Sequence, residues 1–365
     1  MTGDSPDQVT RTWSAARGPA AHVPRRQLQS LQAVRAVAAL LVVMFHMNVH
    51  TLPDTLSAPS LWRGFDMGYA GVEVFFVLSG FIMFYVHSGD FGRPDRFWSY
   101  LSKRFTRIYP FFWLVLVLIV LLRLGSGGEV PGALTLAVSA MLLPFKELHV
   151  LGVQWTLSFE MLFYLIFGLL ILNLRIGLLL GGLWFAICAI LALIGSSTTA
   201  ILFLFSAYNL LFLLGLLAAM LWPRVTSGAP VLFGLGIMIF LVTGLGEALG
   251  GVEYYKPLRT LLYGVGGAFI IAALAALENA ARLRVPQFLV FLGNASYAIY
   301  LIHIAAMSIT AFVLKKLGLG DLPTPVLAIL LFVGAMLAGG LLHVFAEKPI
   351  ISALRRGRIR RAAAT

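Results

Sequence analysis

The first long apolar segment, residues 29–49, carries two side chains that could do chemistry, Arg35 and His46. They are eleven residues apart, close to three turns of an α-helix, so both project from one face, roughly 16 Å apart along the axis. A histidine inside an apolar helix is not a preferred lipid-facing residue, and we interpret His46 as a functional base. Arg35 is either a functional cation or a side chain that snorkels to the membrane interface.

Two further ionisable residues lie inside apolar segments. Glu160 is in segment 153–172, flanked by aromatic and aliphatic residues, with no Lys or Arg within four positions. Such a carboxyl group suits a general acid or base, or a partner for a histidine. His303, in segment 289–314, is either a second acid or base or a core histidine that its neighbours satisfy. We therefore predict His46, Glu160 and His303 as catalytic residues.

A basic segment before the third apolar stretch has a spacing suited to an anionic ligand. Arg104 and Arg107 are three residues apart and share a helix face, where two guanidinium groups can bind anionic oxygens bidentately. The positive-inside rule for membrane proteins accounts for much of the same charge. We predict that Arg104 and Arg107, together with Arg35, bind the phosphates of a cytoplasmic nucleotide-bearing co-substrate.

Metal chemistry has little support in the sequence. His46, His50 and Asp54 follow one another at intervals of four residues, but the Glu of the HExxH zinc pattern is missing and Pro53 should end the helix. Cys188, the single cysteine, lies in an apolar run and offers no Cys-based site. We therefore predict no metal ion.

Composition determines the class of protein that must position these residues. Of 365 residues, 60% are hydrophobic and 12% are charged, about half the charged share of a soluble domain. A soluble nucleotide-binding enzyme, a nucleic-acid-binding protein and a disordered chain are thereby disfavoured. We predict an all-α polytopic membrane protein with about ten transmembrane helices. The predicted spans are 29–49, 70–87, 107–123, 153–172, 177–194, 200–221, 230–249, 258–278, 289–314 and 325–345, and the shorter run 133–144 is predicted to be re-entrant or interfacial.

The basic residues predict the orientation. With the N-terminus in the cytoplasm, nineteen Lys and Arg fall in inside segments and five in outside segments, so both termini are expected to be cytoplasmic. Residues 1–28 are predicted to be a disordered cytoplasmic tail, 29–348 the transmembrane domain and 349–365 a basic cytoplasmic tail. Glu347, Lys348 and Pro349 are interpreted as an interfacial anchor and a helix stop.

Several blocks of sequence resemble one known family. The blocks are LQAVRAVAALLVVMFH at 31–46, GVEVFFVLSGFIM at 71–83, KRFTRIYPFFW at 103–113, LGVQWTLSFEMLFYLIFGL at 151–169, GNASYAIYLIH at 293–303 and EKP at 347–349. In order and spacing, over about residues 28 to 356, they resemble the membrane-bound acyltransferase-3 family, which O-acylates cell-surface sugars. The similarity is greatest to the branch that acetylates exopolysaccharides of the succinoglycan kind.

The resemblance implies roles for individual residues. The family's signature of Arg and His separated by ten residues falls on Arg35 and His46, and its basic pair falls on Arg104 and Arg107. Its Trp-Ser/Thr-Leu…Glu block begins at Trp155 and ends at Glu160. The family often has Asp where this chain has Glu73. We expect Trp155, Glu73 and His149, an outer-loop histidine near the fourth span, to contact the acceptor.

The resemblance also implies an activity. The expected reaction moves an acyl group, acetyl or another, from cytoplasmic acyl-CoA to a hydroxyl of a cell-surface or exopolysaccharide sugar, by direct transfer or through a covalent relay on His46. The expected setting is the bacterial inner membrane, with the bilayer, the sugar acceptor and polysaccharide-assembly proteins as partners and no nucleic acid. Three alternatives are acylation of a small metabolite such as a macrolide, a sugar-lipid transporter or flippase without chemistry, and a structural or sensory membrane protein that uses buried His as a pH switch.

Overall fold

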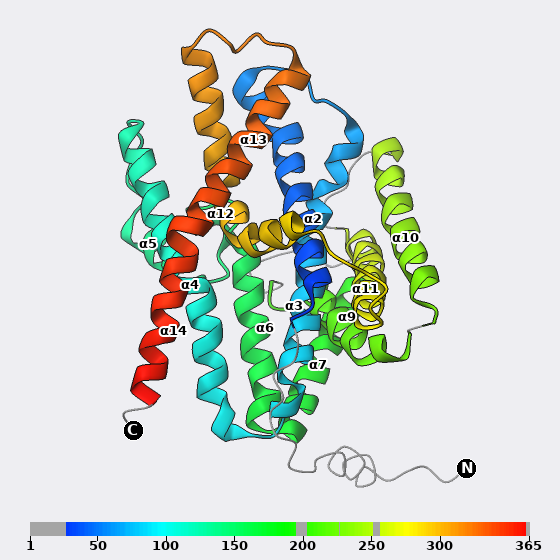
Figure 1. The fold of residues 1–365 in the computed structure, drawn as a ribbon. Helices are drawn as coiled ribbons and strands as arrows, with labels where there is room; N and C mark the ends of the chain where they lie inside the picture. Colours follow the sequence, from blue (N-terminus) through cyan, green and yellow to red (C-terminus); the bar gives the residue numbers. More distant parts are fainter. Residues whose placement is uncertain (1–26, 195–202, 226, 251–255, 363–365) are drawn as a thin grey trace, which may run out of the picture.

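The computed structural model describes residues 27–194, 203–225, 227–250 and 256–362, and within these ranges it contains helices, turns and loops but no β-strand. Ten helical segments of the described chain are long and apolar enough to cross a membrane, which confirms the predicted number. The longer helices, drawn in Figure 1, are α2 (Gln29–His46), α3 (Gly71–His87), α4 (Phe97–Gly125), α6 (Trp155–Leu172), α7 (Leu174–Leu193), α9 (Ala207–Leu221), α10 (Ala229–Gly250), α11 (Pro257–Asn279), α12 (Gln287–Lys316), α13 (Thr324–Leu342) and α14 (Lys348–Ala362).

Shorter helical segments connect these helices. The apolar run 133–144 forms the short helix α5 (Ala133–Ala140), whose eight residues span only about 12 Å, too little to cross a bilayer. The remaining short segments are η1 (Met47–Thr55), η2 (Arg63–Ala70), η3 (Ser88–Asp90), η4 (Pro94–Arg96), η5 (Lys146–Leu148), η6 (Trp222–Arg224) and η7 (His343–Glu347).

The largest difference from the predicted spans is at the start of the third. Helix α4 begins at Phe97, ten residues before the predicted 107, because the Lys- and Arg-containing segment is itself helical. Arg104 and Arg107 therefore lie on a continuous helix that leads into the bundle. Residues 1–26 of the predicted tail 1–28, and 200–202 of the predicted span 200–221, lie outside the described residues.

The C-terminal segment also differs from its interpretation. The predicted helix stop at Pro349 is wrong, because α14 begins at Lys348 and continues through Ala362. Proline is accepted in the first turn of a helix, where its missing N–H would have no partner within the helix. Glu347 does not act as an anchor at the membrane interface, since its side chain is fully buried within the protein. Ten crossings leave both ends of the helical region on one side of a bilayer, and their cytoplasmic orientation stays a prediction.

Helices divide into an inner and an outer set. The inner set comprises the spans that contain α2, α3, α11 and α12, in which between 56% and 67% of the most apolar stretch is buried. The outer set comprises α7, α10 and the spans that contain α4 and α13, in which the buried share is 22% to 28%. Helix α2, which carries Arg35 and His46, lies near the middle of the bundle in Figure 1. The outer helices expose Leu, Ile and Val side chains, as expected of a surface that faces lipid.

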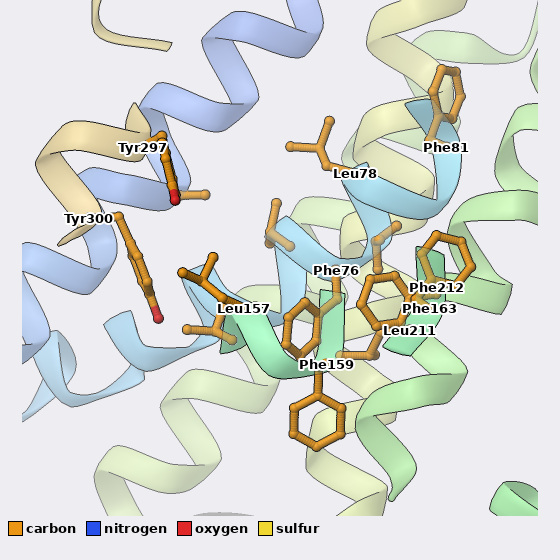
Figure 2. Packing of buried hydrophobic residues seen from close by; sticks show 14 of the residues in the cluster. Phe76, Leu78, Phe81, Leu157, Phe159, Phe163, Leu211, Phe212, Tyr297 and Tyr300 are labelled. Atoms are coloured by element: carbon orange, nitrogen blue, oxygen red, sulfur yellow. The ribbon is translucent and has the colours of Figure 1, made fainter. Parts of the chain in front are cut away.

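Glycines and aromatic side chains bring α3, α6 and α9 together. At Gly80 of α3 and Gly215 of α9, a Cβ atom would meet backbone of the other helix, so these two helices touch backbone to backbone. Beside this contact, which involves the backbone of Phe212, α3, α6 and α9 share a cluster of phenylalanine rings (Figure 2). Phe163 stacks on Phe212 with 4.3 Å between the ring centroids. The cluster continues to Phe159, the residue before Glu160, and thereby fixes α6 against α3.

Candidate active site

Three cavities lie along α2, and each holds some of the predicted site residues. The basic cavity, of about 770 Å³, is lined by residues that include Arg35, Lys103, Arg104, Arg107 and Arg355. The central cavity, of about 110 Å³, is lined by residues that include Arg35, Ser79, Arg104, Arg107, Thr156, Glu160, Tyr164, Ser296 and Tyr300. The histidine cavity, of about 290 Å³, is lined by Val42, Phe45, His46, His50, Tyr69, Val72, Gly152, Val153, Trp155, Tyr208 and Tyr300.

Neighbouring cavities share walls. The basic and central cavities have all three predicted arginines in common, Arg35, Arg104 and Arg107. The central and histidine cavities share Val72 and Tyr300. The cavities therefore form a row through the bundle, with cations at one end and His46 at the other. Arg35 and His46, which lie on one face of α2, line cavities at opposite ends of this row.

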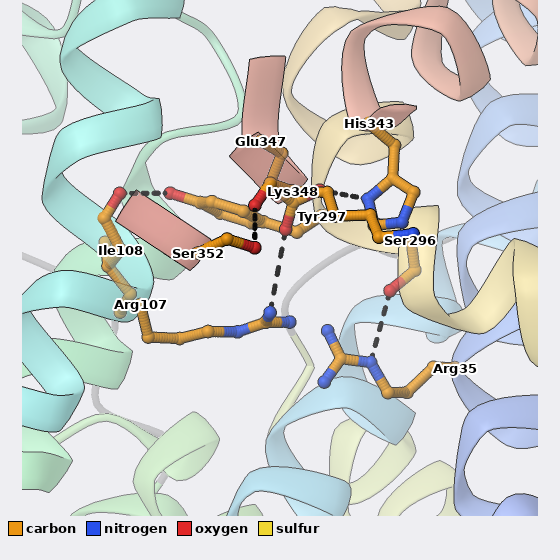
Figure 3. Close-up of polar contacts among 9 residues, drawn as sticks. All are labelled: Arg35, Arg107, Ile108, Ser296, Tyr297, His343, Glu347, Lys348 and Ser352. Carbon is orange, nitrogen blue, oxygen red and sulfur yellow. Dashed lines mark hydrogen bonds and ion pairs between the residues drawn. The ribbon is translucent and has the colours of Figure 1, made fainter. Parts of the chain in front are cut away.

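The arginines come from two helices and are held by different partners. Arg35 Nε donates to Ser296 Oγ at 3.2 Å, and Arg107 Nη1 is 3.6 Å from Glu347 Oε1 (Figure 3). The guanidinium carbon of Arg104 lies over the Tyr164 ring, 5.6 Å from its centroid. The structure therefore brings the three predicted cations to one site.

The Nε atom of one arginine at this site has no hydrogen-bond partner in the part of the chain that the structure describes. The Nε atom of Arg104 is buried and has no hydrogen-bond acceptor among the described residues. A buried donor without an acceptor is rare in folded proteins, because its desolvation is not compensated. An anionic ligand in the basic or central cavity would supply acceptors to this arginine.

Glu347 reaches the arginines because of a local change in helix geometry. The segment η7, between α13 and α14, is a π-helical turn, in which one extra residue changes the direction of the side chains that follow. The fully buried Glu347 accepts a hydrogen bond from His343 Nδ1 at 2.7 Å through Oε2, and its Oε1 faces Arg107 (Figure 3). The C-terminal helices thus position one of the predicted phosphate-binding residues.

Glu160 lies in the central cavity with two hydroxyl partners. Its Oε1 accepts a hydrogen bond from Ser79 Oγ at 3.2 Å and another from the Tyr164 hydroxyl. The Tyr164 ring is the one that Arg104 covers. Glu160 therefore belongs to the arginine side of the row, whereas His46 lines the neighbouring cavity.

His46 pairs with His303. Their rings approach at His46 Nδ1 and His303 Nε2, which are 3.2 Å apart. His46 Nδ1 is also 3.0 Å from the carbonyl oxygen of Val42, and His303 Nδ1 is 2.7 Å from that of Tyr300. Because carbonyl oxygens only accept, both Nδ1 atoms carry the proton and His303 Nε2 accepts from His46. This leaves His46 Nε2 with a free lone pair, as a general base requires.

The predicted acceptor-binding residues have three different positions. Trp155 lines the histidine cavity beside His46. Glu73 is fully buried behind that cavity and accepts a hydrogen bond from the Tyr208 hydroxyl at 3.4 Å. His149 Nε2 donates to the carbonyl oxygen of Leu143 at 2.8 Å and is not among the residues that line the three cavities.

His50 and Asp54 form an exposed pair at 3.5 Å on η1. No group of three or more His, Cys, Asp or Glu that could hold a metal ion occurs within the described ranges.

Sequence reasoning missed several residues of the site. Tyr300 separates the central and histidine cavities, and its hydroxyl is 2.9 Å from Thr156 Oγ1. Tyr69 lines the histidine cavity and donates to Glu247 of α10 at 2.5 Å. Glu247 had a usable signal, since it is an acidic residue within the predicted span 230–249.

Comparison with known proteins identifies the family. The acyltransferase domain that defines the acyltransferase-3 family matches residues 28–344. The exopolysaccharide production protein ExoZ of Rhizobium meliloti (strain 1021) is 32% identical over 313 residues, covering 82% of this chain and 94% of ExoZ. No solved structure matches the chain. The chain therefore belongs to the acyltransferase-3 family and is a multi-pass membrane O-acyltransferase.

Proposed function

We propose that this protein transfers an acyl group, acetyl in the simplest case, from cytoplasmic acyl-CoA to a hydroxyl of an exopolysaccharide or other cell-surface sugar, across the bacterial inner membrane. The main support is the row of cavities that joins three arginines to His46. The name of ExoZ, a relative at 32% identity, favours an exopolysaccharide acceptor.

The cavity sizes suit the parts of an acyl-CoA. The basic cavity, at about 770 Å³, falls in the usual range for ligand pockets and offers arginines to phosphates. The central cavity, at about 110 Å³, is narrow enough for a chain rather than a nucleotide. In this arrangement the thioester end of the donor points toward Tyr300 and the histidine cavity, while the nucleotide stays at the arginines.

His46 then removes the proton of the acceptor. Its Nε2 takes the proton of the sugar hydroxyl while the sugar oxygen attacks the thioester carbonyl carbon. The carbon–sulfur bond breaks, and the CoA thiolate leaves and recovers the proton from the His46 imidazolium. His303 stabilises that imidazolium, because the hydrogen bond from His46 Nδ1 becomes charge-assisted once the ring is cationic.

The charged groups of the row explain how donor and acceptor meet. Acyl-CoA is made in the cytoplasm, whereas a surface glycan is completed outside, so the reacting atoms must approach within the membrane. Polar groups exposed to hydrocarbon there cost several kcal/mol each. Glu160 and Tyr164 line the central cavity and offer polar partners to the donor without exposure to lipid.

The test compares surface glycans from cells that express the chain with those from cells that carry an empty vector. Mass spectrometry should detect an added acyl group that requires acyl-CoA. Replacement of Arg104 and Arg107 by Lys keeps the charge but removes bidentate phosphate binding, so the KM for acyl-CoA should rise. Glycans of unchanged mass would support a flippase, and an acylated macrolide or other small molecule would support the metabolite alternative.

A further inference from the structure

We propose that the histidine cavity is a subsite for one sugar ring of the acceptor, and that two buried carboxylates, Glu73 and Glu247, set its selectivity through the tyrosines that line it. The inference rests on the proposed function and specifies how its acceptor is recognised. It assigns a purpose to two acidic side chains that the transfer step does not use.

The first carboxylate orients Tyr69. Glu247, on α10, is 1% exposed, and its Oε1 accepts the hydrogen bond of the Tyr69 hydroxyl at 2.5 Å. Its Oε2 accepts a hydrogen bond from Tyr263 at 2.7 Å, and Arg259 Nη1 lies 3.5 Å from Oε1. A buried carboxylate with three partners is fixed in place, and so is the hydroxyl of Tyr69.

The second carboxylate orients Tyr208. Glu73, on α3, is fully buried and accepts the Tyr208 hydroxyl at 3.4 Å through Oε1. Tyr208 and Tyr69 both line the histidine cavity, and neither carboxylate does. Two tyrosines from different helical segments therefore line the cavity and donate their hydroxyl protons to acidic groups outside it.

This arrangement selects the kind of ligand. A phenol has one proton, and when it is donated to a carboxylate, the oxygen can only accept from a ligand. The cavity therefore favours a molecule that brings several hydroxyl donors. The rings of Phe45 and Trp155 provide apolar surface in the same cavity, which suits the C–H face of a sugar. Its volume of about 290 Å³ limits the occupant to about one ring.

The position of His46 connects this subsite to the reaction. His46 lines the cavity with its Nε2 free of the pair with His303. A sugar whose other hydroxyls donate to Tyr69 and Tyr208 keeps the reacting hydroxyl next to this base. The two tyrosines are thus positioning residues, and their loss should weaken acceptor binding more than it slows chemistry.

The chain offers a matched pair of variants for the test. Y69F and Y263F each remove one hydroxyl that donates to Glu247, but Tyr263 is not among the residues that line the three cavities. With the oligosaccharide released from the host exopolysaccharide as acceptor, Y69F should raise the acceptor KM about fivefold to tenfold, as expected for one hydrogen bond. Y263F should change it less than about twofold. The KM for acetyl-CoA should stay constant in both.

Y208F provides a second measurement that does not involve Glu247, should Y69F fold poorly. It should raise the acceptor KM while leaving the acetyl-CoA KM unchanged. Unchanged acceptor KM in both Y69F and Y208F, or an equal rise in Y263F, would overturn the proposal. Wild-type protein that acylates no glycan under these conditions would instead refute the proposed function.

Discussion

The pairing of His46 with His303 leads to a prediction about catalysis. Replacing His303 by Leu removes the acceptor of the His46 Nδ1–H group in the histidine pair. The ring of His46 keeps the carbonyl oxygen of Val42 as a partner, 3.0 Å away. His303→Leu should therefore lower kcat without removing the base itself.

The magnitude follows from the change in charge during the reaction. In the resting enzyme, the hydrogen bond from His46 to His303 joins two neutral groups, and such a bond contributes about 1 kcal/mol. After His46 takes up the proton, the donor is charged and the acceptor neutral, and such a bond contributes about 1.5–3 kcal/mol. Only the difference, about 0.5–2 kcal/mol, acts on the barrier. The expected fall in kcat is about twofold to thirtyfold.

The assay is acyl transfer from acetyl-CoA to glycan in membrane vesicles, normalised to the amount of folded protein. His303→Gln should retain most of the activity, because its amide oxygen can accept from His46. His46→Gln should lose at least about a hundredfold, the usual contribution of a positioned general base. Wild-type kcat in His303→Leu would refute this role for the pair. A loss as deep as that of His46→Gln would make His303 the base.

Three other substitutions test the structure around the site. E347Q removes the charge that holds Arg107, so the KM for acetyl-CoA should rise about threefold to tenfold while kcat stays nearly constant. A fall in kcat alone would contradict the role of Glu347 in holding Arg107 for donor binding. E278A removes the carboxylate that caps the start of α2 by accepting its first two backbone N–H groups. Thermal unfolding in detergent should show a loss of stability of about 1–3 kcal/mol. An unchanged unfolding midpoint would show that this cap is not needed. G215A places a methyl group against the backbone of α3, so this variant should also unfold at a lower temperature. In the control variant G182A the added methyl group meets open space, and the unfolding temperature should not change. Equal unfolding midpoints in the two variants would argue against close packing of α3 and α9.

Periodicity and composition were sufficient to predict the helices and the shared face of Arg35 and His46. Ten crossing segments follow from apolar runs of bilayer length, because each span satisfies its own backbone hydrogen bonds. The side of α2 that carries both residues follows from 3.6 residues per turn. These properties are local in sequence, and the structure reproduces them.

Contacts between distant helices could not be predicted in the same way. The approach of His303 to His46 depends on how α12 packs on α2, and the sequence left open whether His303 was catalytic or a satisfied core residue. The burial of Glu347 depends on a π-helical turn, for which its EKP motif gave no sign. Tyr69 and Glu247 are 178 residues apart and meet only in the folded bundle.

The central claim is that His46 removes the acceptor proton at one end of a row of cavities whose other end binds the donor. Its most direct test uses inside-out membrane vesicles that receive radiolabelled acetyl-CoA on the former cytoplasmic face, with glycan enclosed in the lumen. Wild-type vesicles should label the enclosed glycan, and vesicles with His46→Gln at equal protein levels should show at least about a hundredfold less label. Equal labelling in the two preparations would contradict the account.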